Sequence, residues 1–448
     1  MSEGGLAAPT RHPLGWENPG FYDEAKLDKE LRRVFDICHG CRRCFNLCDA
    51  FPRLFDLVDA SPTGELDSVD SKDFKQVADA CTLCDMCFMT KCPYVPPHEF
   101  DLDFPHLMLR YRAVEARKGM TPRADIELAK TDRNGAAACR VAPLVNWSLK
   151  RSNGPMRAIA AKVAGLHKDA QLPEYASQTL LSLARAKPLE ADRSAPAYGR
   201  KAVIYATCFG NFNEPRIGAA ARAVLAKNGV ETEVLHPHCC GMPMLELGQI
   251  AEVAKNARAV AAAFGPWIER GYAVIALVPS CALMLKFEWP LILPGDETIT
   301  RLSSATFDLS EYIVDIARKE GLAPGLAPLS GKGIALHIAC HARAQNMGQK
   351  AREMLKLIPG ADLQVIERCS GHGGAWGYRE STFPVAMKVG APTFRQAATG
   401  GKAILTSECP LAGLHIAQGI ESQEGGGCTP RLASHPIELL AESYGLGA

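Results

Sequence analysis

The sequence contains no long apolar run. The longest stretch, residues 272–287, is broken by Pro279 and Ser280 and is too short to cross a bilayer, so we expect no transmembrane helix. The N-terminal stretch lacks the apolar core of a secretory signal, and it also lacks a twin-arginine pair. We therefore expect a cytoplasmic protein, in which any membrane contact is peripheral and on the inner face.

A charge imbalance and nucleotide fingerprints are also missing. The net charge of +1 gives no basic footprint, so we expect no nucleic-acid partner. No GxGxxG follows a strand, so binding of FAD or NAD is not supported. The segment from Gly371 to Gly374 resembles a phosphate loop but lacks the Lys-Ser/Thr pair that completes one. At 448 residues, with 47% hydrophobic residues, the chain can form two or three globular domains.

Cysteine, in contrast, is abundant, with 17 residues. Without a secretory signal, this number points to a reducing compartment and to metal ligation rather than to disulfides. Eight of the cysteines form two tight runs. The first reads C-x2-C-x2-C-x3-C, and its members are Cys38, Cys41, Cys44 and Cys48. The second reads C-x2-C-x2-C-x4-C before Pro93, and its members are Cys81, Cys84, Cys87 and Cys92.

The spacing within these runs predicts two iron–sulfur clusters. Three cysteines at intervals of three residues can wrap three thiolates around one corner of an iron–sulfur cube, whereas the fourth lies too far along the chain to close easily on the same cube. In two-cluster ferredoxins the fourth cysteine crosses to the other cluster. We therefore assign one [4Fe–4S] cluster to Cys38, Cys41, Cys44 and Cys92, and the other to Cys81, Cys84, Cys87 and Cys48.

Structural zinc and a disulfide framework are the alternatives. Zinc needs only four ligands and would leave one cysteine of each triplet unused. Disulfide frameworks belong to small secreted domains.

Two departures from the ferredoxin pattern loosen the geometry without removing a ligand. Asp49 stands where proline is usual, and the second run is one residue longer before its last cysteine.

Helical patterns surround both runs. Apolar residues at helical spacing predict helices over residues 23–37, 51–60 and 71–80. Clusters embedded among helices favour an α-helical ferredoxin over the compact β-rich kind. We place an extended arm at residues 1–22 and the two-cluster ferredoxin domain at residues 23–100.

Residues 101–200 predict a helical connector. One helix is expected over residues 104–118 and a second over residues 150–166. We expect Arg151, Arg157 and Lys162 on the polar side of the second helix, a pattern that suits either a membrane surface or a solvated face. Cys139 has no cysteine nearby and is interpreted as a small buried residue.

Two similar halves follow the connector. Short apolar runs alternate with alanine-rich helical segments, which predicts parallel sheets covered by helices. The expected strands are residues 202–206, 232–236, 272–278, 334–339, 363–367 and 403–407. The expected helices are residues 217–227, 250–264 and 350–358. We place the two repeats at residues 201–325 and 326–448.

Cysteines recur at matching positions in the two repeats. Cys208 matches Cys340, Cys239 matches Cys369, and Cys281 matches Cys409. Each cysteine follows a predicted strand, at the carboxyl edge of a sheet where open α/β folds place their ligands. Both repeats are therefore expected to offer sulfur ligands from equivalent sites. No role is assigned to Cys428, in a glycine-rich segment expected to form a surface loop.

The motif Cys239-Cys240-Gly241, with Cys208 before it and Cys281 after it, resembles the CCG domain of heterodisulfide reductase B-type subunits. The domain order resembles the iron–sulfur subunits of anaerobic glycerol-3-phosphate dehydrogenase and of glycolate oxidase. The complete pattern of this family holds a noncubane [4Fe–4S] cluster with five cysteines in one repeat.

Both repeats of this sequence fall short of five cysteines. In the first repeat a CxxC has lost its second cysteine to Met284, and the remaining cysteines are Cys208, Cys239, Cys240 and Cys281. Four thiolates still suffice for an ordinary iron–sulfur cluster. In the second repeat Ser370 replaces a cysteine, and Cys340, Cys369 and Cys409 remain. Three thiolates can hold a cluster with one open iron, or His341 or His372 can serve as a fourth ligand. The alternative is that this repeat is metal-free.

The expected fold is thus α+β and multidomain, with an α-helical two-cluster ferredoxin domain before two α/β CCG repeats. The resemblance implies an iron–sulfur electron-transfer subunit of an oxidoreductase, rather than a stand-alone enzyme. It implies a flavoprotein dehydrogenase as donor and a quinone or a thiol–disulfide couple as acceptor. The alternatives are an enzyme that reduces a disulfide or other sulfur substrate at a modified CCG cluster, an electron donor to a peroxide-reducing rubrerythrin-like partner, and a zinc-stabilised scaffold.

Overall fold

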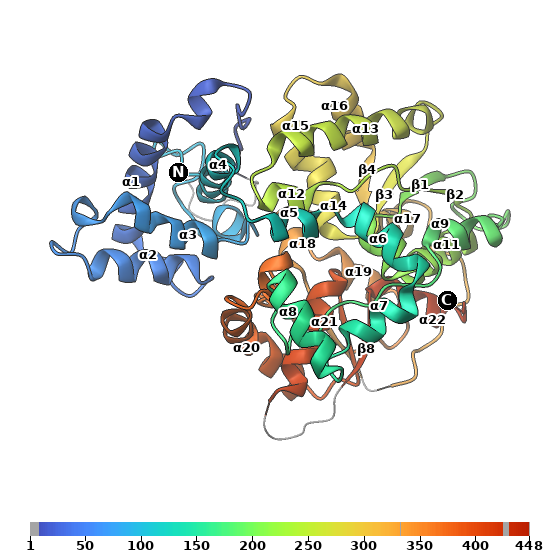
Figure 1. The fold of residues 1–448 in the computed structure, drawn as a ribbon. Coiled ribbons are helices and arrows are strands. Elements are labelled where there is room, and N and C mark those ends of the chain that lie inside the picture. Colours follow the sequence, from blue (N-terminus) through green and yellow to red (C-terminus); the bar gives the residue numbers. More distant parts are fainter. Residues whose placement is uncertain (1–8, 332, 424–429, 448) are drawn as a thin grey trace.

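The computed structural model describes residues 9–331, 333–423 and 430–447. Cys428 and the glycine-rich segment before it lie outside these residues. Figure 1 shows a helical N-terminal part, drawn in blue, beside two α/β units drawn in green to yellow and in orange to red. No helix in the part of the chain that the structure describes is long and apolar enough to cross a membrane.

The N-terminal part is built from helices with buried apolar faces. Its main helices are α1 (Glu24–Cys41), α2 (Ala50–Asp59) and α3 (Lys75–Ala80), with 3₁₀ turns at Pro19–Tyr22, Leu66–Ser68 and Ser71–Phe74. The helix α1 begins at Asp23, whose carboxylate accepts the backbone N–H of Lys26, and it buries Leu27, Leu31 and Val34 at helical spacing. The three helices expected from the sequence are confirmed.

The connector is also helical. Its helices are α4 (Phe104–Arg117), α5 (Arg123–Ala129), α6 (Thr131–Arg140), α7 (Ala142–Leu149), α8 (Gly154–Ala164) and α9 (Leu180–Ala186). The helix expected over residues 104–118 is confirmed. The one expected over residues 150–166 begins four residues later, because Pro155 occupies the first turn of α8.

The placement of Arg157 on the exposed, polar side of the second helix was wrong. This side chain is only 2% exposed. Its guanidinium donates hydrogen bonds to the carbonyls of Leu149, His167, Lys168 and Ala170. Arg157 therefore fixes α8 to the end of α7 and to the loop that follows α8.

The first α/β unit contains a four-stranded parallel sheet in the order β2-β1-β3-β4. Its strands are β1 (Lys201–Tyr205), β2 (Glu231–Leu235), β3 (Ala273–Ala276) and β4 (Thr306–Asp308). Its helices are α10 (Cys208–Phe212), α11 (Pro215–Lys227), α12 (Met242–Glu246), α13 (Ile250–Glu269), α14 (Pro279–Leu283), α15 (Trp289–Ile292), α16 (Glu297–Ala305) and α17 (Leu309–Lys319), with a π-helical turn η5 at Met284–Glu288.

The second unit repeats this architecture in the order β6-β5-β7-β8. Its strands are β5 (Ile334–His337), β6 (Leu363–Ile366), β7 (Ile404–Ser407) and β8 (Arg431–Ala433). Its helices are α18 (Cys340–Ala344), α19 (Lys350–Leu355), α20 (Phe383–Thr399), α21 (Pro410–Glu421) and α22 (Pro436–Ser443), with a 3₁₀ turn at Gly374–Tyr378. All six strands expected from the sequence are present, and both sheets are parallel, as expected.

The carboxyl edges of the two sheets face each other. Helix α14, which carries Cys281, contacts helix α18, which begins at Cys340. Asp308, at the end of β4, and Glu408, just after β7, are buried and interact electrostatically across the same boundary. The strand ends that carry the cysteines of both repeats are thus brought to one internal region.

Candidate iron–sulfur sites

The first group of four thiols gathers at the end of α1. Cys38 and Cys41 lie one turn apart in the last turns of that helix, which ends where Arg42 takes a left-handed φ of 51°. Burial and the nearby thiols of the group raise the pKa of Cys38, and they raise the pKa of Cys44 to about 12. The members of this group are Cys38, Cys41, Cys44 and Cys92.

The second group forms in the loop before the π-helical turn η4 (Cys87–Lys91). Burial and the thiols of Cys84 and Cys81 raise the pKa of Cys48, although Cys48 belongs to the first sequence run. Burial and the surrounding thiols also raise the pKa of Cys87, and one of these neighbours is Cys44 of the first group. The members of the second group are Cys48, Cys81, Cys84 and Cys87.

A third group lies in the first repeat. The Sγ atoms of Cys208 and Cys239 are 3.8 Å apart, and their hydrogen bond lowers the pKa of Cys239. Cys240 hydrogen-bonds to both Cys239 and Cys281. The buried ring of Tyr205 interacts with all four thiols, and its hydroxyl donates to the carbonyl of His238 at 2.6 Å. The four cysteines expected in this repeat are therefore together.

The glycine after the cysteines has the same role in both repeats. Gly241 and Gly371 have φ values of 86° and 77°, in the left-handed region that side chains avoid. Their backbone N–H groups donate to the sulfurs of Cys239 and Cys369 at 3.5 and 3.3 Å. The sharp turn thus aims an amide at a thiolate, and the replacement of a cysteine by Ser370 has left this turn intact.

The connector completes the first-repeat site with a residue that sequence reasoning missed. One oxygen of the Asp132 carboxylate accepts the backbone N–H of Cys239 at 2.6 Å, and the other lies 2.8 Å from Nε2 of His236. Asp132 lies 107 residues before Cys239, in a segment interpreted only as a linker. An acidic residue near the start of a helix is too common for its sequence position to have revealed this contact.

The second repeat is joined to the N-terminal part. Cys340 hydrogen-bonds to Cys369 of its own repeat and to Cys84 of the second group. The hydrogen bond between Cys340 and Cys84 lowers the pKa of Cys84. The hydrogen bond between Cys340 and Cys369 lowers the pKa of Cys369 to about 7. Nε2 of the neighbouring His341 lies 3.3 Å from the carbonyl oxygen of Leu83. The cysteine loop of the N-terminal part therefore rests on this repeat.

Cys409 interacts with a cysteine of the first repeat. Burial raises its pKa to about 11, with smaller contributions from Cys281 of the first repeat and from Glu408. Glu408 in turn accepts the backbone N–H of Ala339 at 3.3 Å, next to Cys340. The three cysteines of the second repeat line one boundary, but Cys409 faces the first repeat.

The two histidines considered as fourth ligands are both buried. His372 is 7% exposed, and its Nδ1 has no hydrogen-bond partner among the described residues. Burial lowers the pKa of His372 to about 3 and also lowers the pKa of His341. Both side chains are therefore neutral at physiological pH, the form in which an imidazole nitrogen can ligate a metal.

Cys139 is buried, as expected, and its Sγ lies 3.4 Å from the carbonyl oxygen of Phe212.

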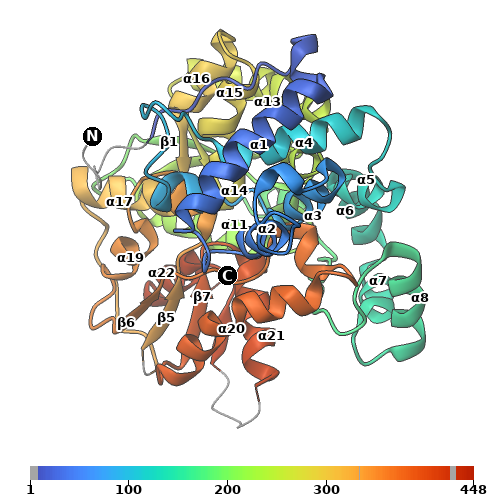
Figure 2. The ribbon, with the colours of Figure 1, turned by 90° about the vertical axis from the view of Figure 1, so that its left-hand side faces the viewer.

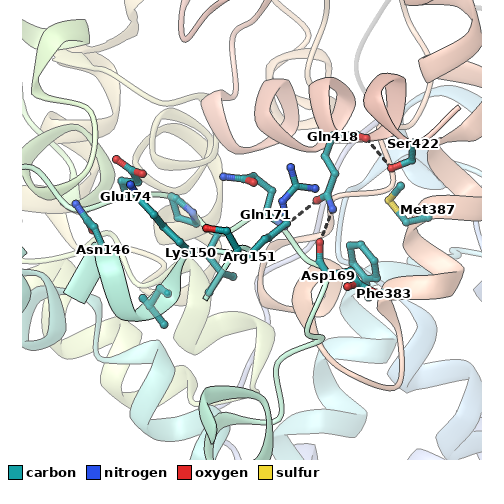
Figure 3. Close-up of a pocket in the computed structure, with 14 residues that line it drawn as sticks. Asn146, Lys150, Arg151, Asp169, Gln171, Glu174, Phe383, Met387, Gln418 and Ser422 are labelled. Atoms are coloured by element: carbon teal, nitrogen blue, oxygen red, sulfur yellow. Dashed lines mark hydrogen bonds between the residues drawn. The ribbon is translucent and has the colours of Figure 1, made fainter. Parts of the chain in front are cut away.

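A cavity of about 930 Å³ opens between the connector and the second repeat (Figure 3). Figure 3 shows Gln418 of α21 reaching Gln171 and Asp169, whose backbone groups it binds at 2.8 and 2.6 Å. Phe383 and Met387 of α20 form its apolar side, and Lys150 and Arg151 lie at the turn between α7 and α8. Phe383 also packs against the buried ring of His415.

The donor sets consist of thiols, the ligands that iron–sulfur clusters take. Among the described residues, no group of three or more His, Cys, Asp or Glu side chains could hold one metal ion. A four-iron cluster binds each thiolate at a different iron, so its ligands stand further apart than those of one zinc ion. A bound cluster would compensate buried thiolates of this kind with the positive charge of its iron.

These observations define the class: an α/β protein with two cysteine-rich repeats behind a helical cysteine-rich part. A family model of the CCG cysteine-rich domain matches residues 202–286 and 334–417, so the chain carries two copies of this domain. The matched ranges contain all seven cysteines assigned to the repeats. The repeat interpretation from the sequence is confirmed.

The chain is also homologous to a subunit of a dehydrogenase, a subunit of a fumarate reductase and a lactate utilization protein. It is 27% identical over 324 residues to the C subunit of anaerobic glycerol-3-phosphate dehydrogenase from Escherichia coli (strain K12), covering 70% of this chain and 76% of that one. It is 27% identical over 256 residues to the B subunit of the CoM/CoB fumarate reductase from Methanothermobacter marburgensis, covering 55% and 47%. Lactate utilization protein A of Geobacillus thermodenitrificans is 28% identical over 186 residues, covering 39% and 74%. The domain and these relatives support iron–sulfur chemistry and electron transfer in an oxidoreductase.

Proposed function

We propose that this protein is an iron–sulfur electron-transfer subunit that relays electrons between a redox protein partner and a terminal acceptor. The observation that carries the proposal is the succession of neighbouring thiols. Cys44 adjoins Cys87, and Cys84 adjoins Cys340, so the first group, the second group and the second repeat follow one another. Electron transfer requires this kind of close spacing between centres, and a scaffold does not.

The ligand sets follow from the groups. One [4Fe–4S] cluster would be held by Cys38, Cys41, Cys44 and Cys92, and a second by Cys48, Cys81, Cys84 and Cys87. A third would be held by Cys208, Cys239, Cys240 and Cys281. When bound, these clusters supply one-electron redox chemistry, while the protein buries them and aims amides and thiols at the ligand sulfurs.

For the second repeat we favour a tuning role for Cys340 over ligation of a separate cluster. Cys84 already belongs to the second group, so a cluster on Cys340 would place thiolate ligands of two clusters in contact. A protonated Cys340 instead donates a hydrogen bond to the Cys84 sulfur, and hydrogen bonds to ligand sulfurs adjust cluster potentials.

The donor and acceptor are proposed from the relatives and from the cavity. Relatives that are subunits of a dehydrogenase and a reductase support a protein partner, for which a flavoprotein is our first choice. A quinone is our first choice of acceptor, because the cavity of Figure 3 has an apolar wall at Phe383 and Met387 and an amide at Gln418. Reduction of a disulfide is the second candidate, favoured by the adjacent thiols of Cys340 and Cys369.

The test is iron and acid-labile sulfide per chain in anaerobically purified protein, together with EPR of the oxidised and reduced states. We expect about twelve irons, of which about four are lost in Cys239→Ala. Cys139→Ala is the matched control, because Cys139 is buried but belongs to no group. About eight irons would leave the repeats without a cluster, and no iron would overturn the proposal.

A further inference from the structure

Helices α7 and α8 form a hairpin whose surface is unusually apolar. Val141, Leu144 and Trp147 are 49%, 62% and 54% exposed, and Ile159 and Val163 are 57% and 76% exposed. They are half of the ten large apolar side chains that are exposed to this degree in the described ranges. In Figure 2 the hairpin stands at the right-hand edge of the molecule, with α8 outermost. Exposed apolar side chains gathered in this way mark an interaction surface.

The hairpin is a built element rather than a frayed one. The buried guanidinium of Arg157 binds four carbonyls on both sides of α8, and α7 contacts α8 directly. The amide of Asn153 donates to the carbonyl of Trp147 at 3.1 Å, which closes the turn between the helices. With its inner side fixed, the hairpin holds Ile159 and Val163, one turn apart on α8, toward solvent.

The charge of this segment has one sign. Residues 133–168 contain seven Lys and Arg and no Asp or Glu, in a chain with almost equal numbers of both signs. Arg151 is paired with Glu421. Arg140, Lys150 and Lys162 are exposed, and no carboxylate within the described ranges forms an ion pair with them. The segment that carries the apolar surface therefore also carries exposed positive charge without carboxylate partners.

We propose that the α7–α8 hairpin docks the protein on the surface of an anionic lipid bilayer. Exposed apolar side chains on helices whose sequence also carries exposed Lys and Arg suit the headgroup layer, where the apolar side chains enter the acyl boundary and the cations meet lipid phosphates. The charge complementarity favours a bilayer over a protein partner. The cavity of Figure 3 lies at the turn of the same hairpin, so docking places its mouth near the lipid headgroups.

Vesicle binding of the full chain tests this proposal without reference to its clusters. We expect co-sedimentation with vesicles of phosphatidylcholine and phosphatidylglycerol in equal parts, little with phosphatidylcholine alone, and release at high salt. The variant Leu144→Ser/Val163→Ser is expected to bind about tenfold or more weakly, because two exposed apolar side chains no longer enter the bilayer. Lys162→Glu is expected to weaken binding about tenfold or more.

The matched control is Met120→Ser, since Met120 is 57% exposed but lies outside the hairpin. It should bind vesicles like the parent protein. Fluorescence of Trp147, obtained as the difference from Trp147→Phe, should shift to the blue on binding. Equal binding to neutral and anionic vesicles, no binding to either, or unchanged binding of the double variant would overturn the proposal. The iron content is expected to be the same in every variant, which separates this test from that of electron transfer.

Discussion

Cys84 and Cys340 are hydrogen-bonded across the boundary between the helical N-terminal part and the second cysteine-rich repeat. Cys84 is also a neighbour of Cys48 and Cys87 in the second thiol group. The Cys84 sulfur therefore belongs to a candidate cluster site, and it also contacts the repeat that lacks a full set of cysteine ligands. The repeat that looks most degenerate in the sequence is the one in closest contact with the N-terminal thiols.

Cys340→Ala is predicted to lower the reduction potential of the centre that includes Cys84. The variant removes a hydrogen bond to a charged sulfur, and on the order of 1.4 kcal/mol corresponds to about 60 mV for a one-electron couple. Redox titration followed by EPR measures the shift, with Cys139→Ala as the control. A rise in potential with loss of about four irons would instead make Cys340 a ligand.

Arg11→Ala is predicted to destabilise the protein by about 3 kcal/mol or more. The guanidinium bridges Asp85, Asp103 and Glu288 at 2.8, 2.7 and 3.1 Å. Its loss leaves the buried carboxylate of Asp85 without an ion pair among the described residues, and it leaves His106 as the remaining partner of Asp103 and Glu288. Denaturant unfolding measures the change. Arg133→Ala is the control, because Arg133 forms an exposed pair with Glu127 and should change stability by less than about 1 kcal/mol. Equal effects of the two variants would contradict a structural role for the Arg11 network.

Asp308→Asn is predicted to stabilise the protein above about pH 6. Burial raises the pKa of Asp308 to about 6, although Lys286 opposes the shift. Because the folded pKa exceeds the unfolded value of about 3.9, the folded state binds more protons, and Asp308 costs stability that grows as pH rises from about 4 to 6. Asparagine removes this cost, up to about 3 kcal/mol, and can still cap α17.

Thermal unfolding of wild type and Asp308→Asn from pH 4 to 8 tests the sign. The two proteins should converge near pH 4. Asp296→Asn is the matched control, since Asp296 also caps a helix, but hydrogen bonding to Thr298 lowers its pKa. That variant should gain nothing at pH 8. A gain for Asp308→Asn that does not change with pH would contradict the assignment to burial.

Gly371→Ala is predicted to be more damaging than Gly241→Ala. Both positions have positive φ, which costs an alanine about 1–2 kcal/mol. A Cβ at position 371 would also lie 2.1 Å from the carbonyl oxygen of Ala386, whereas at position 241 it would meet Val253 at 3.2 Å. The melting temperature and the iron content measure both effects. Gly401→Ala, with a φ of 63° and no atom within 4 Å, isolates the backbone contribution.

Much of the α/β half could be predicted from the sequence. The matching of Cys208 with Cys340, and of Cys239 with Cys369, reflects strands that end at equivalent sheet edges. The two ranges matched by the CCG domain model contain these cysteines in the same order. The missed strands, β4 and β8, have three residues each, too few for an alternating or apolar pattern to stand out.

The contacts that complete the sites could not be predicted. Asp132 reaches Cys239 from the connector, and Cys84 reaches Cys340 from another domain, so neither pair leaves a local pattern. Arg157 was misplaced because helical periodicity describes only the helix itself. Its carbonyl partners lie in the chain beyond both ends of α8, and they draw an arginine inward where the periodicity puts it outside.

The contact between Cys84 and Cys340 also has a consequence in time. The two residues are 256 positions apart, so a ribosome adding 5–20 residues per second delivers Cys340 roughly 13 to 50 seconds after Cys84. During that interval the N-terminal loop has no second repeat to rest on. Cluster insertion into the nascent N-terminal part would therefore meet an exposed loop, which the last-made repeat then closes.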